Sequence, residues 1–305
     1  MKKIKNVSII GLGAIGGSYA AKLCDTDSID FTVIADSRRI EKYYLNKLTV
    51  NRKPYDFNFV QPDNDGDYAD LILIAVKYHN LNQAIDSVRK RVGPETIIIS
   101  LLNGIDSEEI IGEAFGIDKL LYASCVGIDA VRTDNDIRYT TFGKLYFGER
   151  LNQLHTERVE RVKALFDEAQ IPYFIPEDML KAIWWKYMVN IGVNQASAVL
   201  GATYGVFHTI HEAHELLDAA MKEVIAVSAK AGVSLGEEDI AEVHKLLGTL
   251  SADGKTSMLQ DIEAGRKTEV EMLSGALREM GKKHGVPTPV NDTLFRMIRT
   301  LEQMK

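Results

Sequence analysis

The chain has 305 residues, 46% of them hydrophobic and 26% charged, a composition typical of a globular protein large enough for two domains. Its net charge of −7, without a block of like charge, argues against nucleic acid or an anionic membrane as a partner. The longest apolar run, residues 71–76, is far too short to cross a bilayer, and we find no secretory signal. We therefore expect a cytoplasmic protein whose cysteines, Cys24 and Cys125, are reduced thiols.

The first motif is rich in glycine. Residues 4–10 form a short apolar strand, a helical pattern covers residues 17–24, and between them lies Gly11-Leu12-Gly13-Ala14-Ile15-Gly16. A strand, G-x-G-x-x-G and a helix in this order are typical of a dinucleotide-binding site. The first glycine permits the tight turn, the second lets the backbone approach a pyrophosphate, and the third lets helix and strand pack closely. These six residues are therefore predicted to bind a cofactor through its phosphates.

The second strand gives conflicting signals about the cofactor. It covers residues 31–35 and is followed by Asp36. An acid at this place hydrogen-bonds the adenosine ribose and repels a 2′-phosphate, which favours NAD. Arg38 and Arg39 follow, and an arginine near this point can accept the phosphate of NADP. Either arginine can also be a solvated helix residue, so both cofactors stay open.

Two further strands are followed by polar residues. Residues 70–76 lead into Lys77, and residues 96–101 lead into Asn103. Ligands of open α/β sheets bind at the carboxyl ends of the strands, so both side chains are candidate cofactor contacts, and the segment 127–130 is a third candidate. Strands at 120–128, 137–148 and 173–175 and a helix at 153–169 complete the pattern. Alternating strands and helices predict a Rossmann-like, doubly wound parallel sheet over residues 1–176.

The strand signals stop near Pro176. The remaining chain reads as helices at 178–200, 205–231, 237–250, 256–264, 269–284 and 290–303. We therefore predict an all-helical second domain over residues 177–305.

The first of these helices carries three polar residues at intervals of four: Lys186, Asn190 and Asn194. Because each step of four residues advances only about 40° around a helix, they lie along one stripe. A buried lysine is costly unless it is paired or used, and beside two amides it could hold and protonate a substrate oxygen. The alternative is a lysine that extends to solvent beside two solvated asparagines.

The segment 255–269 contains a second group of polar residues. Ser257 lies in a short helix that Gly265 should end. Thr268 with Glu271 three residues later fits a capping box, so the next helix should begin there. Glu269 would then lie in its first turn, where on its own it reads as a plain first-turn acid.

Three histidines recur at intervals of three: His208, His211 and His214. This spacing spreads the rings over about 120° of a helix, which is poor geometry for one metal ion. We therefore predict a solvated face and no metal site.

Taken together, these motifs resemble the ketopantoate reductase (2-dehydropantoate 2-reductase) family over nearly the whole chain. Four matches carry the resemblance, in chain order: the glycine-rich turn; Val76-Lys77 with Leu102-Asn103-Gly104; Lys186, Asn190 and Asn194; and residues 257–261 with 265–269, followed by 285–291. The first match is generic to dinucleotide folds. The third and fourth are specific in combination.

The resemblance implies a role for each matching residue. Lys186 would be the proton donor to the carbonyl oxygen, and Glu269 would orient the bound ligands. Lys77 and Ala130 would contact the cofactor. Asn103 would contact both cofactor and substrate. The remaining substrate contacts would come from Asn190, Asn194 and Ser257.

The resemblance also implies a reaction. Hydride from a nicotinamide cofactor would reduce ketopantoate, a small 2-keto acid, to pantoate for pantothenate and coenzyme A synthesis. NADPH is the family's usual cofactor, whereas Asp36 stands where the family often has an arginine and keeps NADH as the alternative. Family members occur as monomers and as homodimers. Two other hypotheses stay open: a reductase of another branched 2-keto acid, and a non-catalytic dinucleotide-binding sensor.

Overall fold

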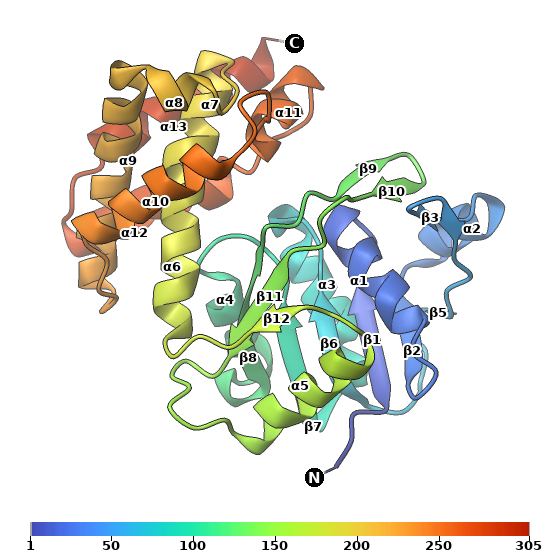
Figure 1. Ribbon diagram of the computed structural model, residues 1–305. Helices are drawn as coiled ribbons and strands as arrows, with labels where there is room; N and C mark the ends of the chain where they lie inside the picture. The colour runs from blue at the N-terminus through green and yellow to red at the C-terminus, as the bar shows by residue number, and fades with distance from the viewer. Residues whose placement is uncertain (1, 305) are drawn as a thin grey trace. The chain divides into compact units, whose positions relative to one another are not determined.

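The computed structural model describes residues 2–304 and divides into two compact units, one ending at Ala182 and one beginning at Ile183 (Figure 1). The first unit is an α/β layer structure, and the second is helical. The predicted fold class is therefore confirmed. The division lies inside helix α6 (Met179–Val189), and the predicted boundary at 176/177 stays a prediction.

The first unit is built on an eight-stranded sheet with the order β12-β11-β8-β7-β6-β1-β2-β5. Its strands are β1 (Asn6–Ile10), β2 (Asp30–Ile34), β5 (Phe59–Val60), β6 (Ala69–Ile74), β7 (Val92–Ser100), β8 (Leu120–Val126), β11 (Lys144–Gly148) and β12 (Tyr173–Phe174). In the part of this order that runs β8-β7-β6-β1-β2-β5, every strand is parallel to its neighbours, as predicted. Strand β11 runs antiparallel to β8, so the sheet is mixed.

Helices cover both faces of this sheet (Figure 1). Residues of α1 (Ala14–Cys24) and α5 (Glu157–Glu168) share one hydrophobic core with the strands, and residues of α3 (Leu81–Val88) and α4 (Ser107–Phe115) share the other. Along β6, Leu71 and Leu73 belong to the first core, whereas Ile72 and Ile74 belong to the second. A central strand covered on both faces needs apolar residues at every position, which explains its continuous apolar run.

A second, smaller sheet lies beside α1. It contains β3 (Thr49–Val50), β4 (Lys53–Pro54), β9 (Val131–Thr133) and β10 (Asp136–Arg138) in the order β4-β3-β10-β9. The predicted single strand over 137–148 is therefore wrong, because β10 and β11 belong to different sheets. The buried Ile137 packs so closely on α1 that a Cβ at Gly17 would lie 2.2 Å from its Cδ1.

The first unit has further helical segments. They are α2 (Ser37–Leu45), which has no buried residue, and the 3-10 turns Tyr78–Asn80, Arg89–Arg91 and Ile117–Lys119.

The second unit consists of helices interrupted by two π turns. In chain order it continues from α6 through the π turn Asn190–Asn194, α7 (Gln195–Leu200), α8 (Val206–Thr209), α9 (His211–Lys230), α10 (Glu237–Thr249), α11 (Ser257–Glu263), the π turn Glu271–Gly275, α12 (Ala276–His284) and α13 (Pro289–Gln303). The predicted helix over 205–231 is broken at Ile210, whose backbone is extended. The predicted helices over 178–200 and 269–284 each contain one of the π turns.

Helix α9 packs one face against the π turn Asn190–Asn194, α12 and α13. Its Leu217, Met221 and Val224 are completely buried. The π turn Asn190–Asn194 packs against it so closely that a Cβ at Gly192 would lie 2.8 Å from Met221 Cγ. Within residues 2–304, no helix has both the length and the apolar character needed to cross a bilayer.

Candidate functional site

The predicted cofactor residues follow strands whose carboxyl ends lie side by side. In the sheet register, Ile10 pairs with Ile34 and with Ile74, and Ile74 pairs with Ser100. These are the last residues of β1, β2, β6 and β7. The structure therefore places the residues that follow these strands along the carboxyl ends of the sheet, as expected. They are Gly11, Asp36, Lys77 and Asn103.

The glycine-rich turn contains glycines of two kinds. Gly11 has φ +99°, and a Cβ there would lie 2.4 Å from the carbonyl oxygen of Ala75. A Cβ at Gly16 would lie 2.0 Å from the carbonyl oxygen of Gly11. Gly13, the N-cap of α1, has an ordinary extended backbone and no heavy atom within 4 Å of where its Cβ would be. The protein's own packing thus requires Gly11 and Gly16, whereas Gly13 leaves open space at the helix N-terminus, which fits the approach of a phosphate.

The rest of the predicted turn has mixed exposure. Leu12 is buried, whereas Ala14 and Ile15, the first residues of α1, are half-buried. The first residues of a helix have N–H groups without helical acceptors, so this end of α1 can bind an anion.

Arg132 of β9 forms a hydrogen bond with the glycine-rich turn, a contact that the sequence does not predict. Its Nη1 donates to the carbonyl oxygen of Leu12 and, at 3.2 Å, to the hydroxyl of Tyr43 in α2. Its Nε donates to the carbonyl oxygen of Asp134 at 2.7 Å. The sequence gives no signal for this residue, because Leu12 lies 120 positions away and β9 belongs to a sheet that was not predicted.

Asp36 has a structural role of its own. It is the N-cap of α2, where its Oδ1 accepts a hydrogen bond from the backbone N–H of Arg39 at 2.9 Å. Its Oδ2 also lies 3.5 Å from Nε of Arg39. The side chain is 46% exposed, so the carboxylate can still meet a ligand at this edge. Arg38 is exposed in the first turn of α2.

The other cofactor candidates lie in loops. Lys77 is exposed and precedes the 3-10 turn Tyr78–Asn80. Asn103 is half-buried in the loop between β7 and α4. Ala130 is half-buried between β8 and β9.

A buried acid lies near the Asn103 loop. Glu108, in the first turn of α4, accepts a hydrogen bond from Ser107 Oγ at 2.8 Å, and Ser107 in turn bonds Ser100 Oγ at 2.9 Å. The backbone N–H of Leu102 donates to the same Ser100 oxygen at 3.3 Å. Burial raises the pKa of Glu108 to about 7. This chain of hydrogen bonds links the acid to the residue that precedes Asn103.

In the helical unit, the residues of the predicted polar stripe lie at the end of α6 and in the π turn that follows it. Lys186 lies in the last turn of α6, and the π turn begins at Asn190 and ends at Asn194. The Nδ2 of Asn194 donates to Oδ1 of Asn190 at 3.3 Å, so the two amides meet. All three side chains are half-buried, whereas Trp184 and Met188 on other faces are buried.

The segment with Ser257 packs against the same group of helices. Thr256, the N-cap of α11, accepts from the N–H of Leu259 at 3.2 Å. Its hydroxyl donates to Ser197 Oγ of α7 at 3.0 Å. Ser257 is the next residue and is exposed.

Glu269 is half-buried and precedes the second π turn. The capping partner of Thr268 differs from the prediction. Its N–H and its hydroxyl both donate to Oε1 of Glu302 in α13, at 2.8 and 2.7 Å. Oε2 of Glu271, the predicted partner, lies 3.0 Å from Nζ of Lys267. The carboxylate of Glu302 accepts these hydrogen bonds because α13 packs beside the second π turn.

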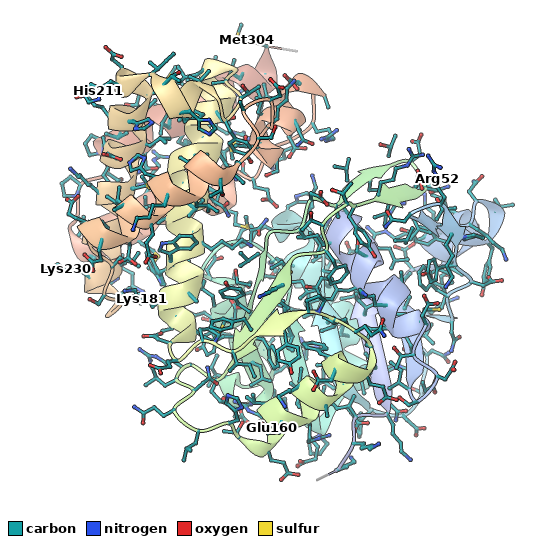
Figure 2. The ribbon with its side chains drawn as sticks, viewed as in Figure 1. Arg52, Glu160, Lys181, His211, Lys230 and Met304 are labelled. Carbon is teal, nitrogen blue, oxygen red and sulfur yellow. The ribbon has the colours of Figure 1, made fainter. Side chains whose placement is uncertain are left out.

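The three histidines do not share one environment. His211 lies at the surface, where its side chain is 81% exposed (Figure 2). His214 is half-buried and stacks on His244 with ring centroids 4.8 Å apart, so the predicted solvated face is wrong at this residue. His208 lies 2.8 Å from the carbonyl oxygen of Leu247 through its Nε2. Among the residues that the structure describes, no group of three or more histidines, cysteines or acids could hold a metal ion.

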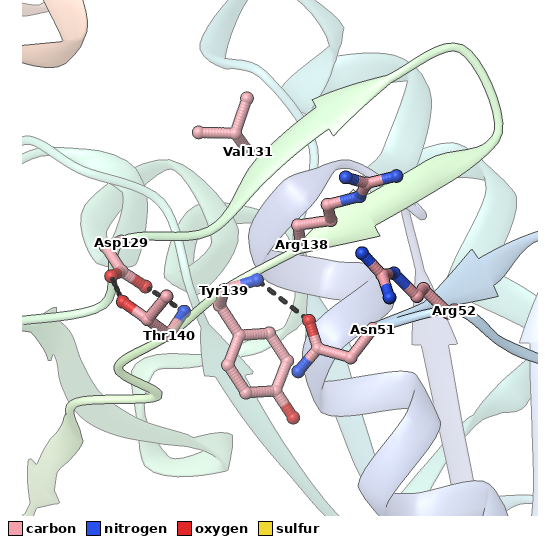
Figure 3. Close-up of a pocket in the computed structure, with 7 residues that line it drawn as sticks. All are labelled: Asn51, Arg52, Asp129, Val131, Arg138, Tyr139 and Thr140. Atoms are coloured by element: carbon pink, nitrogen blue, oxygen red, sulfur yellow. Dashed lines mark hydrogen bonds between the residues drawn. The ribbon is translucent and has the colours of Figure 1, made fainter.

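An open pocket of about 330 Å³ lies on the small sheet (Figure 3). Asp129, in the candidate segment 127–130, is the one predicted contact among its lining residues, which are Asn51, Arg52, Asp129, Val131, Arg138, Tyr139 and Thr140. Several of its polar groups pair with each other or with residues nearby. Asp129 accepts from the N–H of Thr140 at 2.9 Å, and Asn51 accepts from the N–H of Tyr139 at 3.0 Å.

Both parts of the chain match the same protein family. Residues 7–152 match the family described as ketopantoate reductase PanE/ApbA, and residues 178–302 match its C-terminal part. The 2-dehydropantoate 2-reductase of Vibrio cholerae is 28% identical over 299 residues, which cover 98% of both chains. That of Aquifex aeolicus is 27% identical over 304 residues, which cover 96% of both chains.

Solved structures agree on the fold. A 2-dehydropantoate 2-reductase from Methylococcus capsulatus is similar with a TM-score of 0.83 at 26% identity, over 98% of this chain and 97% of that one. A D-mandelate dehydrogenase, solved with NADH and anilino(oxo)acetate, has a TM-score of 0.85 at 22% identity over 98% of both chains. Because the two family matches together span most of the sequence in the expected order, the chain belongs to the ketopantoate reductase family of oxidoreductases.

Proposed function

We propose that this protein reduces ketopantoate to pantoate with a hydride from a nicotinamide dinucleotide. The observation that carries the proposal is the group of polar residues Lys186, Asn190 and Asn194 on a helical segment whose other residues are buried or half-buried, in a chain of this family. The product would supply pantothenate and coenzyme A synthesis in the cytoplasm, with the enzyme acting as a monomer or as a homodimer.

The first unit carries residues that fit the cofactor. The open space at Gly13 and the N-terminus of α1 suit a pyrophosphate. Asp36 and Arg38 would lie towards the adenosine, whereas Lys77, Asn103 and Ala130 complete the set. When bound, the dinucleotide supplies the hydride. We propose NADPH as the cofactor, as in the family, with NADH as the alternative because Asp36 would repel a 2′-phosphate.

The second unit carries residues that fit the acid–base chemistry. As the ketone carbon accepts hydride, negative charge develops on its oxygen. The ammonium of Lys186 stabilises that charge and gives the oxygen one proton, which completes the alcohol. Asn190, Asn194 and Ser257 have donors and acceptors for the carboxylate and hydroxyl of the substrate, and Glu269 orients the bound ligands.

The test is cofactor oxidation by the purified protein with ketopantoate, in parallel with NADPH and NADH, and with other branched 2-keto acids as a second arm. Turnover that is fastest with ketopantoate supports the proposal. Turnover with another 2-keto acid alone would replace the substrate. Dinucleotide binding without turnover in any arm would instead support the sensor hypothesis.

A variant tests the role of Lys186. We expect Lys186→Met to lower kcat by about 10²- to 10⁴-fold, the usual contribution of a general acid, while dinucleotide binding is unchanged. Lys181→Met in the same helix is the matched control and should retain kcat. Near-normal turnover of Lys186→Met would show that another group protonates the oxygen.

A further inference from the structure

The two π turns of the helical unit lie next to the residues proposed for catalysis. The first, Asn190–Asn194, directly follows the helix that carries Lys186. The second, Glu271–Gly275, begins two residues after Glu269, and its Gly275 N–H bonds the carbonyl oxygen of Val270 at 3.0 Å in the wide i, i+5 pattern. Such turns are rare and are frequently found at functional sites.

Each π turn has a backbone carbonyl that accepts a hydrogen bond from a buried side chain. At the first turn, Gln195 Nε2 donates to the carbonyl oxygen of Ile191 at 2.9 Å and to Asn291 Oδ1 at 3.0 Å. At the second turn, the hydroxyl of Tyr187 donates to the carbonyl oxygen of Leu273 at 2.6 Å. The hydrogen bond from Gln195 to Ile191 is local, between residues four positions apart. The hydrogen bond from Tyr187 to Leu273 joins residues that are 86 positions apart in the chain.

Tyr187 is well placed to fix one segment against the other. It is 1% exposed and packs edge-to-face on Trp184, with centroids 5.8 Å apart and an interplanar angle of 76°. Leu273 is also 1% exposed. A short hydrogen bond between two buried groups holds its geometry, because neither partner can exchange it for water. Tyr187 directly follows Lys186 in the chain, and Leu273 lies one helical turn after Glu269.

We propose that Tyr187 is a positioning residue, whose hydroxyl bond to Leu273 sets the placement of Lys186 relative to Glu269. The inference rests on the proposed function, since it concerns the residues assigned to proton donation and ligand orientation. Tyr187 itself need not touch the substrate. It acts through the backbone of the second π turn.

The first experiment removes only the hydroxyl. Tyr187→Phe keeps the ring packed on Trp184, so we expect a folded protein. A misplacement of the order of 1 Å can cost up to about 10²-fold in rate, and we expect kcat to fall by about tenfold. Dinucleotide affinity should change less than about twofold, because the predicted cofactor residues lie in the other unit. Tyr204→Phe, at a half-buried tyrosine of the same unit, is the matched control and should leave kcat unchanged.

A double-mutant cycle separates positioning from general stability. If Tyr187 acts through the placement of Glu269, Tyr187→Phe should have little further effect in a Glu269→Gln background. Unchanged kcat in the single variant, or the same tenfold loss in both backgrounds, would overturn the proposal. Survival of turnover in Lys186→Met would instead be a failure of the proposed function. The cycle uses whichever 2-keto acid the enzyme turns over.

Discussion

At the scale of single residues, the glycines of the first turn show how packing and ligand binding can be told apart. The motif alone treats Gly11, Gly13 and Gly16 alike. In the structure, a Cβ at Gly11 or Gly16 would overlap other backbone atoms, whereas a Cβ at Gly13 would meet nothing within 4 Å. The packing of the protein itself therefore gives no reason for glycine at position 13, in keeping with the phosphate contact proposed there.

This difference predicts opposite outcomes for two alanine variants. Gly13→Ala should change the unfolding temperature little, because the extended backbone suits alanine and this gain offsets the poorer N-cap, but it should weaken dinucleotide binding by about tenfold or more. Gly16→Ala should destabilise the fold by more than about 2 kcal/mol through overlap with Gly11. Thermal unfolding and a cofactor titration measure both. Normal affinity in Gly13→Ala would place the pyrophosphate elsewhere.

Glu108 makes stability depend on pH in an unusual direction. Burial raises its pKa from 4.5 in the unfolded chain to about 7 in the folded protein. Between these values the folded state binds a proton that the unfolded chain has released, so the free energy of unfolding decreases as pH rises through this window and then levels off. The size of the loss is about 3 kcal/mol.

Glu108→Gln should remove this contribution. The amide oxygen can still accept from Ser107, and no carboxylate has to ionise in the core. The variant should therefore be more stable than the wild type at pH 8 and show a smaller difference at pH 5. Urea denaturation at the two pH values measures this. Glu109→Gln, at the exposed neighbouring residue, is the control. Equal stability of wild type and Glu108→Gln at pH 8 would contradict the raised pKa.

At the scale of elements, the cap of α2 complicates any test of cofactor choice. Asp36→Ala would remove both the charge and the hydrogen bond to the Arg39 N–H, at a cost of about 1 kcal/mol. Asp36→Asn keeps a capping oxygen and removes only the charge. We expect Asp36→Asn to raise the NADPH/NADH ratio of kcat/KM by about tenfold with little change in unfolding temperature. Steady-state kinetics with both cofactors measure the ratio, and an unchanged ratio would mean that the carboxylate does not face the 2′ position.

The elements also show where the sequence is informative. The central strands β1, β2, β6, β7 and β8 and their common carboxyl ends are predictable, because burial on both faces demands continuous apolar runs. The short edge strand β5 has no such run and was not predicted. The π turn after Lys186 is not predictable from the sequence. A π turn adds one residue to a helix and hardly disturbs the spacing of polar side chains, and this one is supported by distant hydrogen bonds such as that of Gln195 to Asn291. The small sheet is equally hidden, since β3 and β4 are two residues each and β3 pairs with β10, a strand far along the chain.

At the scale of the whole molecule, the predicted site residues fall into two sets, one in each compact unit. The glycine-rich turn, Lys77 and Asn103 belong to the unit ending at Ala182, whereas Lys186 and Glu269 belong to the unit beginning at Ile183. The order of the motifs along the chain made this division predictable. The supporting contacts, such as Arg132 with Leu12 and Thr268 with Glu302, depend on tertiary packing that no local pattern encodes.

Both edges of the large sheet end in strands of only two residues, Phe59–Val60 and Tyr173–Phe174. An edge strand has a row of unpaired N–H and C=O groups that can recruit a strand from another molecule, and here that row is very short. Intermolecular β-pairing is therefore disfavoured at both ends. A homodimer of this protein would gain few backbone hydrogen bonds by continuing the large sheet at either end.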